Sequence, residues 1–102
     1  MEKYTVPPDI VTVFGLTYCP YCRGAKKYLA KCNAQHVYIE IDELGEEEKD
    51  RVVAYVQSVN PKKSFPTVVF GDSGEVVVGF EVKKMKDALE IMIQKYPQVI
   101  QP

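Results

Sequence analysis

The chain has 102 residues, 46% of them apolar, with 13 basic and 14 acidic side chains and a formal net charge of −1. It is long enough for one domain over residues 1–102 but not for two, and its balanced charge gives no electrostatic reason to bind nucleic acid or an anionic membrane. Its three cysteines are too few for a disulfide scaffold. Residues 1–8 form a polar extension without a secretory signal, and no apolar run could cross a bilayer. We therefore expect a monomeric cytoplasmic protein with reduced thiols.

The first half of the chain predicts a strand, a helix and a second strand. Residues 10–14, IVTVF, are β-branched and aromatic, as in a strand covered on both faces. Helical spacing then follows, on a face made of Ala25, Tyr28, Leu29 and Cys32. Asn33 is the expected helix stop. Residues 36–42 alternate, with Tyr38, Glu40 and Asp42 expected on a polar face opposite the apolar one.

The second half predicts a helix, two strands and a final helix. Residues 45–60 open with acidic side chains, which favour a helix start, and then present an apolar valine face. Residues 66–70 and 75–80 are short strands joined by a GDSG turn, hence an antiparallel hairpin. Helical spacing over 85–96 ends at Pro97. The order β-α-β-α-β-β-α predicts an α/β fold with a mixed sheet flanked by helices.

Cys19 and Cys22 lie between the first strand and the first helix, in the stretch CPYC. Pro20 suits the first helical position, which makes Cys19 the N-cap residue. There the free backbone N–H groups and the helix dipole favour a thiolate, and such cysteines have pKa values of about 3.5 to 7.5. Helical spacing turns Cys22 toward the apolar face. An exposed thiolate beside a buried thiol suits nucleophilic attack by Cys19 followed by resolution by Cys22.

A zinc site and a structural disulfide are the alternatives for these cysteines. Cys19, Cys22, Cys32 and His36 are ligands of a suitable type for zinc. The helix between them carries Cys32 roughly 15 Å from Cys22, whereas a zinc–sulfur bond is about 2.3 Å. A reducing compartment disfavours a permanent disulfide. We therefore favour a reactive dithiol, with no metal site, and interpret Cys32 as a packing residue.

The residues TYCPYCRGAKKYL, followed by FPTVVF and VVVGF, resemble the glutaredoxin branch of the thioredoxin superfamily over about residues 10–96. The resemblance implies a thioredoxin fold with a four-stranded sheet and a dithiol:disulfide oxidoreductase acting on disulfide-containing proteins. It implies no bound cofactor, with glutathione or another small thiol as co-substrate. It also implies a cis bond before Pro66, which exposes the Phe65 backbone to an extended substrate. Tyr21 would flank the thiol groove.

The chain departs from the glutaredoxin pattern at positions that hold glutathione. Leu16 stands where a lysine is common, and Ser64-Phe65-Pro66 replaces Thr-Val-Pro. Residues 78–82, VGFEV, replace Gly-Gly-X-Asp-Asp, so that Gly79, Phe80 and Glu81 would form the rest of the wall. Lys63 matches a basic position of the family that can pair with a carboxylate of the thiol ligand. The alternative is that Lys63 is a solvated loop lysine.

Two further alternatives concern the donor and a metal cluster. The Gly-Phe turn is similar to that of the small redoxins that reduce ribonucleotide reductase and draw electrons from thioredoxin reductase. Those redoxins usually carry Val-Gln between their cysteines, where this chain has Pro-Tyr. Some glutaredoxins instead hold an iron–sulfur cluster between two subunits, through the equivalent of Cys19 and an external thiol.

Overall fold

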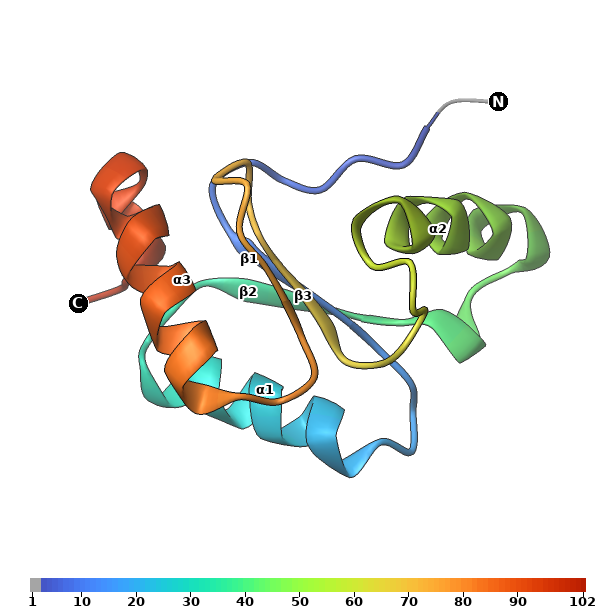
Figure 1. Cartoon of the computed structure of the whole chain (residues 1–102), viewed down its shortest axis with the longest axis horizontal. Helices are drawn as coiled ribbons and strands as arrows, with labels where there is room; N and C mark the ends of the chain where they lie inside the picture. The colour runs from blue at the N-terminus through green and yellow to red at the C-terminus, as the bar shows by residue number, and fades with distance from the viewer. Residues whose placement is uncertain (1–2) are drawn as a thin grey trace.

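A computed structural model describes residues 3–102 and places a mixed sheet between helices (Figure 1). Its elements are β1 (Val11–Gly15), α1 (Pro20–Lys31), β2 (His36–Glu40), α2 (Glu46–Val59), β3 (Thr67–Phe70), β4 (Val76–Val78) and α3 (Val82–Lys95), with 3-10 turns at Ile41–Glu43 and Pro97–Val99. The predicted order β-α-β-α-β-β-α is confirmed, and the architecture is the thioredoxin-like α/β fold.

The sheet has four strands in the order β2-β1-β3-β4. β1 runs parallel to β2, with Val11 opposite His36, and antiparallel to β3, with Val11 opposite Phe70. β3 and β4 form the predicted antiparallel hairpin. β1 is therefore an interior strand, and all five of its residues are buried. Its carboxyl end leads directly into the cysteine stretch.

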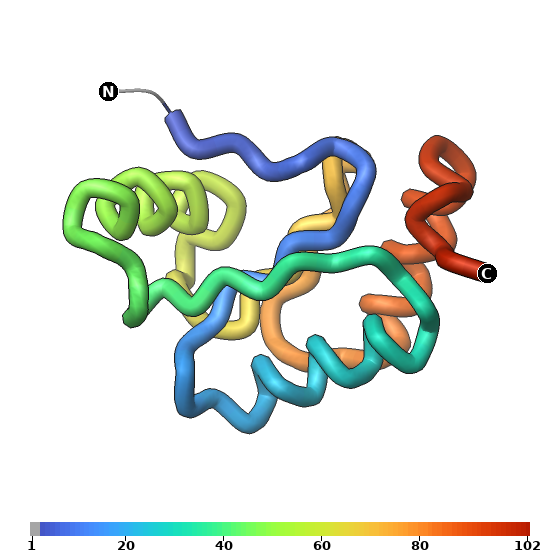
Figure 2. The backbone as a smooth tube through the Cα atoms, turned by 180° about the vertical axis from the view of Figure 1, so that it is seen from behind, coloured from blue at the N-terminus to red at the C-terminus, as the bar shows by residue number. Residues whose placement is uncertain are grey.

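Helices cover both faces of the sheet (Figures 1 and 2). Val11 and Val13 of β1 point to the face covered by α1 and α3 and join the larger core. Phe14 points to the other face, where it packs with the valines of α2 in a second core. The alternation of side chains along one strand thus separates two cores. α1, which carries the cysteines, and α2 lie on opposite sides of the sheet.

The first helix ends where the sequence predicts. Asn33 has a left-handed φ of 57°, and asparagine tolerates that region better than most residues. The Asn33 N–H donates to the Ala30 carbonyl and the Ala34 N–H to the Leu29 carbonyl, each at 3.0 Å. This pair of bonds is the Schellman pattern of a helix end.

The second strand differs from its prediction in two ways. It ends at Glu40 rather than Asp42, because Ile41–Glu43 turns as a 3-10 helix whose Ile41 is buried in the second core. Tyr38 is not on a polar face. It packs against the larger core, and its hydroxyl donates to the Leu16 carbonyl at 2.7 Å. Alternating side chains do not imply that one face of the strand is exposed to solvent here, because helices cover both faces of the sheet.

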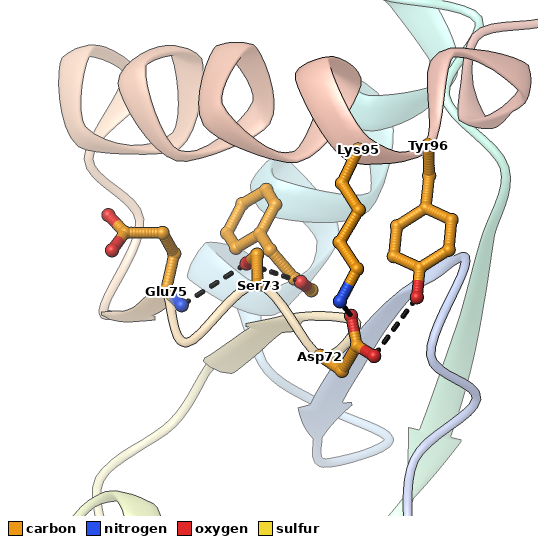
Figure 3. A network of polar contacts seen from close by, with 6 residues as sticks. Asp72, Ser73, Glu75, Lys95 and Tyr96 are labelled. Atoms are coloured by element: carbon orange, nitrogen blue, oxygen red, sulfur yellow. Dashed lines mark hydrogen bonds and ion pairs between the residues drawn. The ribbon is translucent and has the colours of Figure 1, made fainter.

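The β3–β4 turn is attached to the C-terminal end of α3 by a carboxylate (Figure 3). Asp72 accepts hydrogen bonds from the Tyr96 hydroxyl at 2.9 Å and from the Lys95 ammonium at 3.2 Å. The Asp72 N–H donates to the Pro8 carbonyl at 3.1 Å, which also fixes the described part of the N-terminal extension. No helix within residues 3–102 has the length and apolar character needed to cross a membrane.

Candidate active site

The two cysteines of CPYC form a disulfide at the N-terminus of α1, with their Cα atoms 5.2 Å apart. Cys19 has an extended backbone and is the N-cap residue, and Pro20 is the first helical residue, as predicted. The Cys19 Sγ accepts a hydrogen bond from the Cys22 N–H at 3.3 Å. A free backbone donor and the helix dipole therefore both act on the Cys19 sulfur.

The two sulfurs differ in their exposure. Cys19 is half-buried, whereas Cys22 has 0% exposure and faces the core beside Ala25. Gly15 makes room for it: a Cβ at Gly15 would lie 2.8 Å from the Cys22 Sγ and 2.6 Å from the Tyr38 hydroxyl oxygen. Sequence reasoning missed this role of Gly15. The available signal was a glycine that ends a buried strand four residues before a reactive cysteine.

The loop that precedes Pro66 is organised by Asn60, which is only 2% exposed. Its amide Nδ2 donates to the Ser64 carbonyl at 3.1 Å and to the Thr67 hydroxyl at 3.0 Å. Its Oδ1 accepts from the Lys62 N–H at 3.1 Å. One buried amide thus joins the end of α2 to the start of β3. Sequence reasoning did not identify Asn60.

The Phe65–Pro66 peptide bond is cis, as the resemblance implies. Pro66 is buried, and its carbonyl accepts a hydrogen bond from the Gly79 N–H at 2.8 Å. Gly79 has a φ of 84°, a left-handed conformation that favours glycine. A backbone hydrogen bond therefore joins Pro66 and Gly79, two predicted groove residues that are far apart in sequence.

The other predicted wall residues differ in their packing. Phe80 packs in the core with α1, and a Cβ at Gly24 would lie 2.7 Å from its ring. Phe65 packs in the second core, with α2. Glu81 is exposed and pairs with Lys84 at 3.2 Å. The two phenylalanines are thus on opposite sides of the sheet.

A pocket of about 270 Å³ lies between Leu16, Phe65 and α2. Lys63 lines it, together with Lys49 and Asp42. Lys63 is exposed and has a left-handed φ of 55°, and its N–H donates to the Asn60 carbonyl at 3.0 Å. Tyr21 lies at the start of α1 and is 68% exposed.

Carboxylates surround Thr17 in the loop that leads to Cys19. The Thr17 N–H donates to Asp42 Oδ1 at 3.0 Å, and its hydroxyl donates to Glu40 Oε2 at 2.8 Å. Desolvation acts to raise the pKa of Asp42, but the hydrogen bonds from Thr17 outweigh it, and the pKa lies below its ordinary value. Asp42 is therefore ionised at neutral pH, close to the loop that carries the nucleophile candidate.

The four residues considered as zinc ligands are not brought together. Cys32 caps the C-terminal end of α1, whereas Cys19 caps the opposite end of the same helix. The His36 ring, at the start of β2, lies 2.8 Å from the Ala34 carbonyl. Residues 3–102 contain no group of three or more histidine, cysteine or acidic side chains placed to hold a metal ion.

Residues 11–75 match the family model of the glutaredoxins. The chain belongs to the glutaredoxin family. The matched region includes the Cys19–Cys22 pair, the cis proline and the Asn60 loop, so this glutaredoxin carries the CxxC redox disulfide of a family of thiol–disulfide oxidoreductases. The family predicted from CPYC and its context is confirmed.

Relatives of known sequence and structure agree with this assignment. Glutaredoxin-2 of Schizosaccharomyces pombe is 32% identical over 60 residues, which cover 59% of this chain and 53% of that protein. The crystal structure of a glutaredoxin from Methanosarcina mazei Go1 has a TM-score of 0.75 and 31% identity, covering 84% of this chain and 82% of that one. A buckwheat glutaredoxin–glutathione complex has a TM-score of 0.65 and 25% identity, covering 82% and 76%. The alignments span about half or less of the curated relatives.

Proposed function

We propose that this glutaredoxin reduces protein disulfides and mixed disulfides, with Cys19 as nucleophile and Cys22 as resolving thiol. The Cys19 thiolate attacks one sulfur of the substrate, the S–S bond breaks, and the departing sulfur leaves as a thiolate that takes up a proton. Cys22 then loses its proton and attacks the Cys19 sulfur. This releases the second substrate thiol and forms the Cys19–Cys22 disulfide, which two molecules of a donor thiol reduce while becoming one disulfide.

The asymmetry of the two sulfurs is the observation that carries the proposal. Cys19 is half-buried and lies at a helix N-terminus, with a backbone N–H directed at its sulfur. Cys22 is wholly enclosed by the core. A substrate therefore reaches Cys19 first, and the thiolate form of Cys19 is the stabilised one. An extended substrate would lie along the Phe65–Pro66 backbone and the Gly79 turn, with Tyr21 at its edge.

Trapping of the intermediate tests these roles. Cys22→Ser should accumulate a mixed disulfide between Cys19 and a model disulfide protein, detectable by non-reducing electrophoresis and mass spectrometry. Cys19→Ser should form none and should lose dithiol activity. Cys32→Ser, which alters the third thiol, is the matched control and should turn over normally. A stable adduct on Cys22 in the Cys19→Ser protein would reverse the assignment.

We also infer that glutathione is a poor donor, and that a smaller thiol or thioredoxin reductase serves better. A glutathione donor is supported in general by the glutathione complex of the buckwheat relative. Two observations oppose efficient use by this chain. Phe80 stands at a position of the turn where the glutaredoxin pattern has a small residue, and its ring lies against Gly24. Val82, exposed at the first position of α3, offers no carboxylate to the amino group of a γ-glutamyl ligand.

Each missing charge-assisted hydrogen bond costs about 1.5 to 3 kcal/mol. One or two such losses would weaken glutathione about tenfold to several hundredfold relative to typical glutaredoxins. Lys63 remains as a cation for the carboxylate of a shorter thiol, beside the pocket at Leu16. This arrangement favours a donor that needs only one carboxylate contact.

A donor panel distinguishes these possibilities. The oxidised protein is reduced with glutathione, with cysteamine, with a short mercapto-acid, and with thioredoxin reductase plus its nicotinamide reductant. Phe80→Cys combined with Val82→Asp should lower the apparent KM for glutathione. Phe80→Cys combined with Ile91→Asp puts the same charge on an exposed apolar position further along α3 and should give no gain. Saturation of the wild-type protein at low glutathione, with no gain in the double variant, would overturn this inference.

A further inference from the structure

A second pocket lies away from the cysteines, between the N-terminal segment and α2. Its volume is about 480 Å³, and it is lined by Lys3 and Tyr4 on one side and by Asp50, Arg51, Ala54 and Tyr55 on the other. In Figure 1 the N-terminal segment runs beside α2, which covers the sheet face opposite α1. The volume falls within the range of small-ligand sites, about 300 to 1,000 Å³. The thiol chemistry of Cys19 does not use this pocket.

Two tyrosine rings form the rigid part of the pocket. Tyr4 and Tyr55 meet edge to face, with centroids 5.5 Å apart, and each also packs against the buried Phe14 ring, at 5.9 and 5.6 Å. Desolvation by burial raises the pKa of both hydroxyls above 10.0, so both rings are neutral at physiological pH. Aromatic side chains fixed in this way favour a planar apolar partner.

Arg51 supplies an unpaired donor at the same place. Its Nε is buried beyond the reach of a ligand and has no hydrogen-bond acceptor within residues 3–102, so the terminal nitrogens of the guanidinium group are the ones that could meet a ligand in the pocket. Buried N–H groups in folded proteins nearly always have a partner, and a guanidinium group pairs best with a planar anion such as a carboxylate. Over the described part of the chain, neither Lys3 nor Arg51 forms an ion pair, and Asp50 is the sole carboxylate in the lining. The lining thus carries two cations and one anion, and the charge of Glu48 also acts on Tyr4, where, after desolvation by burial, it adds to the rise in the pKa. Lys3 and Arg51 are the lining groups that would favour a negative ligand.

We propose that this pocket binds a small aromatic carboxylate. The ring of the ligand would lie against Tyr4 and Tyr55, and its carboxylate would accept hydrogen bonds from Arg51. The ring contributes apolar contact, and the charge decides between otherwise similar ligands, because an uncharged ring would leave the Arg51 donor unpaired. This site is independent of the redox proposal, since no residue is shared between the two.

Three probes with one ring system test the proposal: 2-naphthoate, 2-naphthalenemethanol and 2-naphthalenemethylamine. Each is titrated into the full oxidised chain while amide shifts are followed by NMR. We expect naphthoate to shift the amides of residues 50–58, to bind about tenfold or more tightly than the alcohol, and to bind more tightly still than the amine. Arg51→Gln should remove this preference. Arg23→Gln, which alters the other arginine of the chain, should keep it.

Ala54→Leu provides a second variant that leaves every charge in place. Ala54 is exposed on α2, and leucine is compatible with a helix, so the variant should fold while its side chain fills the pocket. Naphthoate should then no longer shift residues 50–58. Equal binding of all three probes, absence of binding to the wild-type protein, or unchanged binding to Ala54→Leu would each overturn the proposal.

Discussion

Replacing Asn60 by alanine should destabilise the protein more than any surface change and should impair the reduction of disulfides. Asn60 is the buried amide that joins the end of α2 to the loop carrying Phe65 and Pro66. The substitution removes the hydrogen bonds donated by Nδ2 to the Ser64 carbonyl and the Thr67 hydroxyl, a longer contact from Nδ2 to the Ser64 hydroxyl at 3.4 Å, and the bond accepted by Oδ1 from the Lys62 N–H. Two contacts remain in the alanine variant: the Thr67 hydroxyl still donates to the Ser64 carbonyl at 2.8 Å, and the Lys63 N–H still donates to the backbone carbonyl of residue 60 at 3.0 Å. Neither of them ties β3 to α2.

The magnitude follows from the loss of these side-chain hydrogen bonds. Each hydrogen bond contributes about 0.5 to 1.5 kcal/mol net, and the deleted side chain leaves an unfilled space. We therefore expect a loss of about 2 to 4 kcal/mol in the free energy of unfolding, or a fall in Tm of about 10 to 25 °C for a domain of this size. Activity should fall while Cys19 keeps its reactivity toward a small alkylating agent, because the substitution displaces the substrate-binding loop and leaves the start of α1 intact.

Urea unfolding measures the loss of stability, and turnover of a protein disulfide measures the loss of activity. Alkylation of Cys19 shows whether the nucleophile keeps its reactivity. Asn60→Asp should be at least as harmful as alanine: a carboxylate keeps the acceptor for Lys62, but it cannot donate to Ser64 or Thr67, and it buries a negative charge against the Ser64 carbonyl oxygen. Asn33→Gly is the matched control. It removes the other asparagine of the chain at an exposed left-handed position that suits glycine, and it should cost under about 0.5 kcal/mol. A loss below about 1 kcal/mol for Asn60→Ala would refute the reasoning.

Three further predictions follow from the cysteines and from Asp72. Iodoacetamide should modify Cys19 of the reduced protein first, with a midpoint below about pH 8 because of its N-cap position, and earlier labelling of Cys22 would contradict this. Cys32→Ala should cost on the order of 1 kcal/mol by urea unfolding, because the side chain packs against the larger core, yet disulfide reduction should stay within about threefold. The Tyr96 hydroxyl, and then Lys95, lower the pKa of Asp72 below 3.8, so its carboxylate stabilises the fold above that pH. Asp72→Asn should therefore lower the unfolding free energy at about pH 7, and its difference from wild type should vanish as the pH falls through the lowered pKa. An unchanged difference at about pH 2 would contradict the linkage.

Local pattern was enough to predict the order of the elements and the place of the redox pair. The β-branched run before Cys19, Pro20 after it, and helical spacing from Cys22 onward each depend on neighbours within one or two turns. The burial of Cys22 follows from that spacing, because a helix directs residues three, four and seven apart to the same side, and the greater exposure of Cys19 follows from its place at the N-cap. The end of α1 next to Asn33 could be predicted as well, because the end of a helix also depends on a few neighbouring residues.

The surroundings of the pair were decided by contacts between residues far apart in the chain. The bond between the Gly79 N–H and the Pro66 carbonyl, the room that Gly15 leaves for Cys22, and the amide network of Asn60 have no periodicity by which a sequence could reveal them. The packing of Phe65 and Phe80 against different cores, on opposite sides of the sheet, is also set by tertiary contacts. Tyr38 likewise alternates as a polar-face residue, yet it is half-buried, because a second layer of helices covers the face that alternation alone would leave to water.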